Sequence, residues 1–242
     1  MTLSNWFAAE KASPLIIGHR GASVDAPENT LAAFYLAIEQ GADGIELDVQ
    51  LSADGKIVIF HDDDVTRVSK GQGKVKNMTL SQLKALDLGY GQKIPTLDEL
   101  FEMLGPTTLY NIEIKDFRLG DHGLETAVAD RVAAHNLASH VLISSFNPLA
   151  VRRANRLCGK ATPTGLLREA GLSQYSYLIA PADADHPHHT MVNANYMAWA
   201  KKRGQRVNVW TVDDPVEARR LADLGVDGII TNKPAFLRAS LM

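Results

Sequence analysis

The sequence has a single cysteine, no long apolar run and no excess of basic residues. Cys158 alone cannot form an internal disulfide, so nothing in the chain requires an oxidising compartment. No stretch approaches the ~18 consecutive apolar residues of a membrane-spanning helix. Lys11 interrupts the first stretch that resembles the apolar part of a signal peptide. These features predict a soluble, cytoplasmic protein without a membrane span.

The balance of charge argues against a nucleic-acid-binding surface. The chain has 25 Lys and Arg against 28 Asp and Glu, a formal net charge of −3, and no dense Lys/Arg stripe. With 45% hydrophobic and 22% charged residues, its composition is that of an ordinary globular protein. A chain of 242 residues is long enough for one α/β barrel, and no linker or low-complexity segment divides it. We therefore expect residues 1–242 to form a single domain without a nucleic-acid partner.

Two acids interrupt an apolar strand-like run in the first quarter of the chain. Over residues 44–49 apolar side chains alternate with Glu46 and Asp48, which is the period of a β-strand. The two carboxylates therefore project side by side from one face. A turn at 53–55 leads into a second apolar run that ends directly before His61. Two carboxylates and an imidazole are thus predicted at the mouth of one strand unit.

Like charges on one strand face repel each other and lose hydration when they are buried, so they need a compensating cation. Carboxylate oxygens without a nearby cysteine favour a hard ion, Mg²⁺ or Ca²⁺, over Zn²⁺. The alternative is a solvent-facing strand edge, where alternate acids merely keep contact with water. This segment alone does not decide between the two interpretations.

A histidine and an arginine follow an earlier apolar strand segment. Residues 15–17 are apolar, and His19 and Arg20 come next, between two glycines. A lone histidine here is most simply a core residue with satisfied hydrogen bonds. An arginine flanked by glycines, however, can approach a phosphate with two N–H groups at once. Arg20 is therefore a candidate phosphate ligand, and it makes His19 a candidate site residue.

The residues that follow lead into a helix. Apolar residues at i, i+3, i+4 and i+7 predict a helix that begins near Leu31 and ends at Gly41. Asn29 and Thr30 are interpreted as helix caps. Glu28 is a candidate for supporting the site from behind the residues that contact the substrate.

A second strand with polar residues on one face is expected over residues 109–115. Asn111, Glu113 and Lys115 share that face, and the opposite face is apolar. One interpretation is a simple ion pair between Glu113 and Lys115. The preferred interpretation is a third metal-binding carboxylate beside a phosphate-binding lysine.

Strand and helix patterns alternate over most of the chain, which predicts a parallel sheet. About eight strands in 242 residues indicate a closed (β/α)₈ TIM barrel, whose active site lies at the carboxyl ends of the strands. The excursion at about 62–92, after the second strand, is long for a βα loop and predicts either a functional lid or a small insertion. Trp210, near the end of the strand predicted over 207–212, either packs in the barrel or stacks on a small polyol.

The segment 183–189 contains two acids and three histidines and is a second candidate for a metal cluster. Its side chains lack the i, i+4 spacing of a helical metal site, and Pro187 favours an irregular loop. Metal binding there is the less favoured interpretation.

Taken together, these residues resemble the glycerophosphodiester phosphodiesterase family. Any one of the matching motifs is weak, but they occur in order and with sensible spacing along nearly the whole chain. They are His19-Arg-Gly21, Pro27-Glu-Asn-Thr30, Gly41-Ala-Asp-Gly-Ile-Glu-Leu-Asp48, Asp54-Gly55, His61-Asp62, Arg67, Pro95-Thr-Leu97, Asn111-Ile-Glu-Ile-Lys115, Ser144-Ser-Phe146, Val209-Trp-Thr-Val212 and Gly225-Val-Asp-Gly-Ile229. One departure is Thr231-Asn232, where members of the family often carry Thr-Asp.

The resemblance implies hydrolysis of a small-molecule glycerophosphodiester to sn-glycerol 3-phosphate and an alcohol, within a (β/α)₈ barrel. It implies that one divalent cation, Mg²⁺ or Ca²⁺, is held by Glu46, Asp48 and Glu113. His19 and His61 would then be the general acid and base. Three further side chains are the expected substrate ligands: Arg20 and Lys115 on the phosphate, and Trp210.

Two other functions remain open from the sequence. One is a barrel phosphodiesterase for other headgroups, such as a lysophospholipase D or a cyclising sphingomyelinase-like enzyme, although no lipid-docking helix is evident. The other is a phosphate or polyol binder without catalytic activity, which the intact pair of histidines argues against. The sequence does not indicate the alcohol, the identity of the cation or the oligomeric state.

Overall fold

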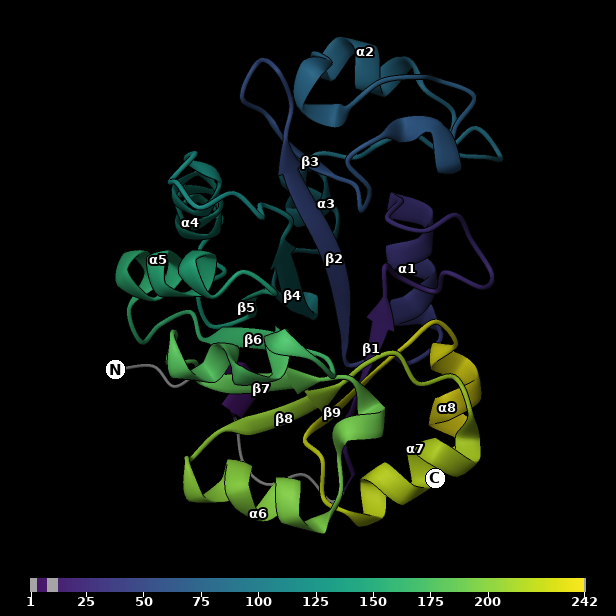
Figure 1. Cartoon of the computed structure of the whole chain (residues 1–242). Coiled ribbons are helices and arrows are strands. Elements are labelled where there is room, and N and C mark those ends of the chain that lie inside the picture. Colours follow the sequence, from purple (N-terminus) through teal and green to yellow (C-terminus); the bar gives the residue numbers. More distant parts are fainter. Residues whose placement is uncertain (1–3, 8–12, 242) are drawn as a thin grey trace.

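The computed structural model describes residues 4–7 and 13–241 and places a closed ring of eight parallel strands at the centre of the fold (Figure 1). Around the ring the strand order is β1, β2, β4, β5, β6, β7, β8 and β9, and β9 pairs back with β1. The bounds are β1 Leu15–His19, β2 Gly44–Leu51, β4 Leu109–Ile114, β5 Val141–Ser145, β6 Thr164–Arg168, β7 Ala184–Pro187, β8 Arg206–Val209 and β9 Gly228–Thr231. The predicted TIM barrel is confirmed.

Among residues 4–7 and 13–241, seven α-helices surround the ring, and an eighth, α2, lies in the excursion above it (Figure 1). They are α1 Leu31–Glu39, α2 Leu80–Ala85, α3 Leu97–Leu104, α4 Leu124–Ala134, α5 Pro148–Cys158, α6 Ala194–Lys202, α7 Pro215–Asp223 and α8 Pro234–Leu241. The short 3₁₀ segments are η1 Asn5–Phe7, η2 Val65–Arg67, η3 Val75–Asn77, η4 Gly105–Thr107, η5 Leu172–Leu178 and η6 His189–Met191. Within the described residues, no helix is long and apolar enough to cross a membrane.

Side-chain caps explain where several of these helices begin. Thr79 and Thr96 form reciprocal capping boxes with Gln82 and Glu99, as their spacing predicts. Asn147 caps α5, whose first residue is Pro148. The helix starts therefore follow directly from local sequence.

Alternation along the strands separates an apolar outer face from a polar inner one. On β2 the outward residues Ile45, Leu47 and Val49 are fully buried and pack with residues of the surrounding helices. At the amino ends of several strands the inward residues are apolar, and Trp6 packs among them. Further along β2 the inward positions are Glu46 and Asp48. The polar residues therefore gather toward the carboxyl ends of the strands.

The predicted excursion after the second strand forms a small layer on the carboxyl side of the barrel. It begins with β3, Ile57–Ile59, which pairs antiparallel with β2 after a turn in which Gly55 has a φ of 72°. The residues that follow bury their own cluster of apolar side chains, separate from the clusters under the barrel helices. The strands β2 and β3 extend away from the ring toward this layer (Figure 1).

The irregular loop expected over 183–189 is wrong, because β7 covers Ala184–Pro187 within the barrel. The segment lacks β-branched residues, and long-range contacts decide its structure. Asp185 pairs with the buried Arg168 of β6, and His186 Nε2 accepts a hydrogen bond from Asn208 Nδ2 of β8 at 3.0 Å. The strand expected over 207–212 is shorter than predicted, and Trp210 lies directly after β8.

Candidate active site

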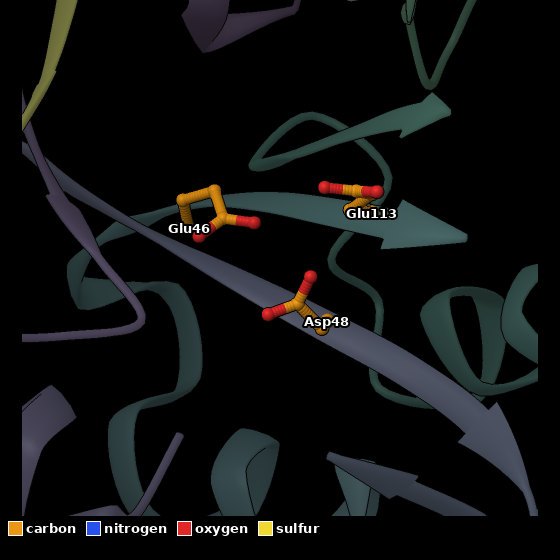
Figure 2. A group of neighbouring side chains, drawn as sticks. All are labelled: Glu46, Asp48 and Glu113. Atoms are coloured by element: carbon orange, nitrogen blue, oxygen red, sulfur yellow. The ribbon is translucent and has the colours of Figure 1, made fainter. Parts of the chain in front are cut away.

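Three buried carboxylates from two neighbouring strands converge at the carboxyl side of the barrel. Glu46 and Asp48 project inward from β2, and Glu113 projects from β4, whose position 113 is in register with position 48 (Figure 2). One ligand oxygen from each lies within 4.8 Å of the others. All three are buried, with exposed fractions of 4%, 1% and 7%. The solvent-facing alternative for Glu46 and Asp48 is therefore wrong.

The cost of placing these acids together is visible in their pKa values. Burial and the charges of Asp48 and Glu113 raise the pKa of Glu46 well above its usual range. Burial and the charge of Asp48 likewise raise the pKa of Glu113 to about 7. Burial also acts to raise the pKa of Asp48, but the charges of Arg20 and Lys115 outweigh it and lower that pKa. The cluster is thus electrostatically unsatisfied when all three acids are ionised.

A divalent cation fits this donor set. Three carboxylates offer hard oxygen ligands, and no sulfur ligand accompanies them. In the described part of the chain this is the one cluster of three or more such ligands. Lys115 also brings a positive charge to the acids, with its Nζ 2.9 Å from Glu113 and 3.7 Å from Asp48. The ion pair considered as an alternative for Glu113 is therefore present within the same cluster.

Arg20 is held beside the acids by its backbone and its side chain. Its φ of 55° lies in the left-handed region, and its backbone N–H donates to Glu46 Oε2 at 3.1 Å. Its Nη1 donates to Glu28 at 2.9 Å, which gives Glu28 the supporting position expected for it. Its Nε lies 3.3 Å from Asp48 Oδ2 but makes no aligned hydrogen bond with any described residue. This N–H is therefore buried against Asp48 without an aligned acceptor.

Asn29 corrects a prediction. It does not cap α1; Thr30 does, by accepting a hydrogen bond from the Ala33 backbone N–H. The Asn29 Nδ2 instead donates to Asp48 Oδ2 at 2.8 Å, and its φ of 56° directs it inward. Because Asn29 directly precedes the cap residue Thr30, nothing in the sequence pointed to its contact with Asp48.

The two predicted histidines line the same cavity, and the Nδ1 of each lies within hydrogen-bond distance of a side-chain oxygen. His19, at the end of β1, places Nδ1 2.7 Å from Asn232 Oδ1, and burial together with the Arg20 charge lowers its pKa. His61 follows β3 and places Nδ1 2.6 Å from Asp62 Oδ1. Because carboxylate and amide oxygens accept, Nδ1 carries the proton in both rings. Nε2 is then the atom free for chemistry.

A cavity of about 130 Å³ lies over these groups. It is lined by every site residue expected from the sequence except Asp48, which lies directly beside it, bonded to Asn29: His19, Arg20, Glu46, His61, Glu113, Lys115 and Trp210. Phe146 and Trp210 form its apolar wall, with their rings edge to face at 5.3 Å. The Trp210 Nε1 donates to the His186 carbonyl at 2.7 Å, so the ring also packs into the barrel. Both interpretations of Trp210 are thus compatible with its position.

Asn232 and Asp213 lie behind His19; in the sequence Asn232 is notable only as a departure from the family pattern, and no motif points to Asp213. Asp213 accepts hydrogen bonds from the Asn232 backbone N–H at 2.8 Å and from its Nδ2 at 2.6 Å. This leaves Asn232 Oδ1 to face His19. Asn232, which departs from the family pattern at Thr231-Asn232, therefore still offers an acceptor to His19. The negative charge is carried by Asp213, the next residue in this chain of hydrogen bonds.

We expect Asn232→Asp to destabilise the protein, by about 1–3 kcal/mol, because it replaces a donor with a second carboxylate facing Asp213. Thermal unfolding at neutral pH measures the loss. Adding Asp213→Asn should restore much of the stability, since it exchanges the donor and acceptor of the pair. A single variant as stable as wild type, or a double variant with no recovery, would contradict this account of the pair.

The segment 183–189 does not form a metal site in the structure. His189 pairs with Glu217 at 2.7 Å, Asp185 pairs with Arg168, and Asp183 accepts the backbone N–H of Thr164. These acids are thus taken up by structural contacts.

The arrangement in the barrel suits one class of chemistry. The imidazoles can transfer protons, and the positively charged Arg20 and Lys115 can hold an anionic ester in the same cavity. Together with the buried carboxylates these groups meet the requirements of phosphoester hydrolysis. Parallel barrels present such groups at the carboxyl ends of their strands. The fold and the site together define a barrel hydrolase of phosphate esters.

Comparison with known proteins gives the family. The model of the glycerophosphoryl diester phosphodiesterase family matches residues 19–236. A glycerophosphodiester phosphodiesterase of Caldanaerobacter subterraneus subsp. tengcongensis is 40% identical over 233 residues, covering 92% of this chain and 96% of that protein. The chain belongs to this family, as the resemblance of its motifs predicted.

Two solved structures illustrate the likeness. A phosphodiesterase from Oleispira antarctica, in complex with its product sn-glycerol-3-phosphate, is 30% identical, with a TM-score of 0.81 and coverage of 94% of this chain and 96% of that chain. A protein from Silicibacter pomeroyi, at 24% identity, shares the fold with a TM-score of 0.90 over 98% of this chain and 97% of that chain.

Proposed function

We propose that this protein hydrolyses glycerophosphodiesters to sn-glycerol 3-phosphate and an alcohol, in a reaction that requires one divalent cation. The observation that supports this most strongly is that His19, His61, Glu46 and Glu113 line one 130 Å³ cavity, with Asp48 in the same acid cluster directly beside it. The family and the product bound to the Oleispira relative support the same substrate class. Residues 1–242 would act as one barrel domain with the excursion as its insertion, and a cytoplasmic location remains a prediction from the sequence.

Glu46, Asp48 and Glu113 would hold the cation, Mg²⁺ or Ca²⁺. When bound, such an ion polarises a phosphoryl oxygen and stabilises the charge that develops on it. Arg20 and Lys115 would bind the other phosphate oxygens, since both of these cationic side chains line the cavity. Trp210 would lie against the glycerol carbons as part of the apolar wall.

The histidines would move the protons. One Nε2 accepts the proton of the glycerol 2-hydroxyl as that oxygen bonds to phosphorus, and the other Nε2 donates a proton to the departing alkoxide. This gives a cyclic phosphate and the free alcohol. Water then opens the ring: the second histidine takes the water proton and the first returns its proton to the 2-oxygen. Each imidazole ends in its starting state.

Product analysis on a small panel tests the proposal. Glycerophosphocholine, glycerophosphoethanolamine and lysophosphatidylcholine are incubated with the protein, with and without a chelator. We expect sn-glycerol 3-phosphate and free alcohol from the soluble diesters, loss of turnover with chelator, and recovery with excess Mg²⁺ or Ca²⁺. Turnover of the lysolipid alone would favour the lipid-directed alternative. Binding without turnover would favour the non-catalytic one, and chelator-resistant turnover would remove the cation from the scheme.

A further inference from the structure

A residue of the excursion reaches into the supports of the site. Arg67, at the end of η2, donates through Nε to Asp62 Oδ2 at 2.5 Å. Its two terminal nitrogens donate to Glu28, Nη1 to Oε2 at 3.0 Å and Nη2 to Oε1 at 2.6 Å. Asp62 and Glu28 come from different loops, and Arg67 is the side chain that joins them.

These contacts complete a chain of alternating charges around the cavity. Asp48 faces Arg20, Arg20 donates to Glu28, and Glu28 accepts from Arg67. From Arg67 the chain continues through Asp62 to the Nδ1 of His61. It therefore connects a proposed cation ligand with a proposed proton-transfer residue through one guanidinium.

The backbone that carries Arg67 is well anchored. Val65 is fully buried in the apolar cluster of the excursion, and its N–H donates to the Gly73 carbonyl at 3.0 Å. Asp64 caps η2 by accepting from the Thr66 N–H at 3.0 Å. The guanidinium thus projects from a fixed point, although its own side chain is 48% exposed.

We propose that Arg67 is a positioning residue, which holds Asp62 on His61 and Glu28 on Arg20 and so makes the excursion a working part of the active site. This inference rests on the proposed function. With Arg67 in place, one Asp62 oxygen is engaged by the guanidinium and the other by His61, so the carboxylate cannot turn away. A lysine has one nitrogen and cannot engage both carboxylates as the planar guanidinium does.

Steady-state kinetics on glycerophosphocholine with saturating cation tests this. Arg67→Ala should lower kcat by about 10-fold or more, the usual effect of losing a partner that orients a site residue. KM should rise by a smaller factor than kcat falls, because Arg67 does not line the cavity and acts on the phosphate ligand Arg20 only through Glu28. Arg67→Lys should recover part of the loss. The melting temperature should change little, since half-exposed ion pairs contribute little to stability.

Lys84→Ala is the matched control. It removes another ion pair of the same excursion, that with Glu99, which has no connection to the cavity, and it should leave kcat within about twofold of wild type. In an Asp62→Asn background, Arg67→Ala should lose most of its effect, because the two residues act in series. An Arg67→Ala kcat within about twofold of wild type, or an unchanged effect in that background, would overturn the proposal.

A spectroscopic readout separates this inference from the proposed function. In ¹⁵N NMR of the imidazole, wild-type His61 should be fixed with its proton on Nδ1, and Arg67→Ala should reduce that tautomer in favour of exchange. Lys84→Ala should leave the signal unchanged. If wild type hydrolysed no glycerophosphodiester, the proposed function would fail, yet this signal would still show whether Arg67 orients His61. An identical His61 signal in Arg67→Ala would reject the orientation itself.

Discussion

Replacing either His19 or His61 with alanine is expected to lower kcat for glycerophosphocholine by about 10²-fold or more with cation present, the size of a lost general acid or base. Each ring has a distinct place in the site, His19 on Asn232 and His61 on Asp62, so neither can substitute for the other. Both line the same cavity, with Nε2 available for the proton. Because each ring serves in both steps, the double variant should be little slower than either single one.

His135→Ala is the matched control for these variants. His135 is half-buried and bonds to Asp98 at 2.9 Å, away from the cavity, so its loss should leave kcat unchanged. Cation affinity should persist in the two site variants, since the acids remain. If His61→Ala kept near-full turnover of glycerophosphocholine, the scheme with two proton-transferring histidines would have to be abandoned.

The parts of the site that could be predicted from sequence are those where a local pattern conflicts with its surroundings. Glu46 and Asp48 stand out because they interrupt an otherwise apolar strand, and Glu113 and Lys115 stand out for the same reason. A barrel turns that face inward, which brings positions 48 and 113 into register on adjacent strands. Period-two alternation within the strands therefore predicted the shared face of the acids, while the alternation of strand and helix patterns predicted the barrel.

The parts that could not be predicted depend on contacts between distant segments. Asn29 has an ordinary local interpretation as a cap, and only the approach of Asp48 gives it another partner. Asn232 meets His19 across 213 residues of sequence. The strand β7 has no β-branched residue, and its buried Asp185 and His186 are held by Arg168 and Asn208 from the neighbouring strands. Local propensity carries no signal for such pairings.

The same buried acids that suit a cation should make the cation-free protein sensitive to pH. The pKa of Glu113 is raised to about 7, mainly by burial and by Asp48, whereas an unfolded chain restores its usual value of 4.5. The folded state therefore binds this proton more tightly than the unfolded state. Its stabilising effect is fully present below about pH 4.5 and is lost as the pH rises through about 7.

Glu113→Gln removes this dependence and shows the conflict between stability and function at the site. With chelator present at about pH 8, the variant should be more stable than wild type by up to about 3 kcal/mol, and at about pH 5 the difference should shrink. Adding Mg²⁺ or Ca²⁺ should stabilise wild type above pH 7, because the cation replaces the missing proton, but should stabilise the variant far less. Urea unfolding measures the stability difference between the two proteins at each pH. Repeated with added cation above pH 7, it measures the stabilisation of wild type and of the variant by the cation.

Activity provides the other half of this prediction. Glu113→Gln should lower turnover by about 10²-fold or more at any cation concentration that saturates wild type, because one of three charged ligands is gone. Glu125→Gln is the contrast, since Glu125 is equally buried and paired with Arg153 at 2.7 Å but lies outside the cavity. It should lower stability by leaving Arg153 without its partner, and keep turnover. A Glu113→Gln protein that is less stable than wild type at about pH 8 with chelator, or fully active with cation, would show that this carboxylate is held by Lys115 for structure alone.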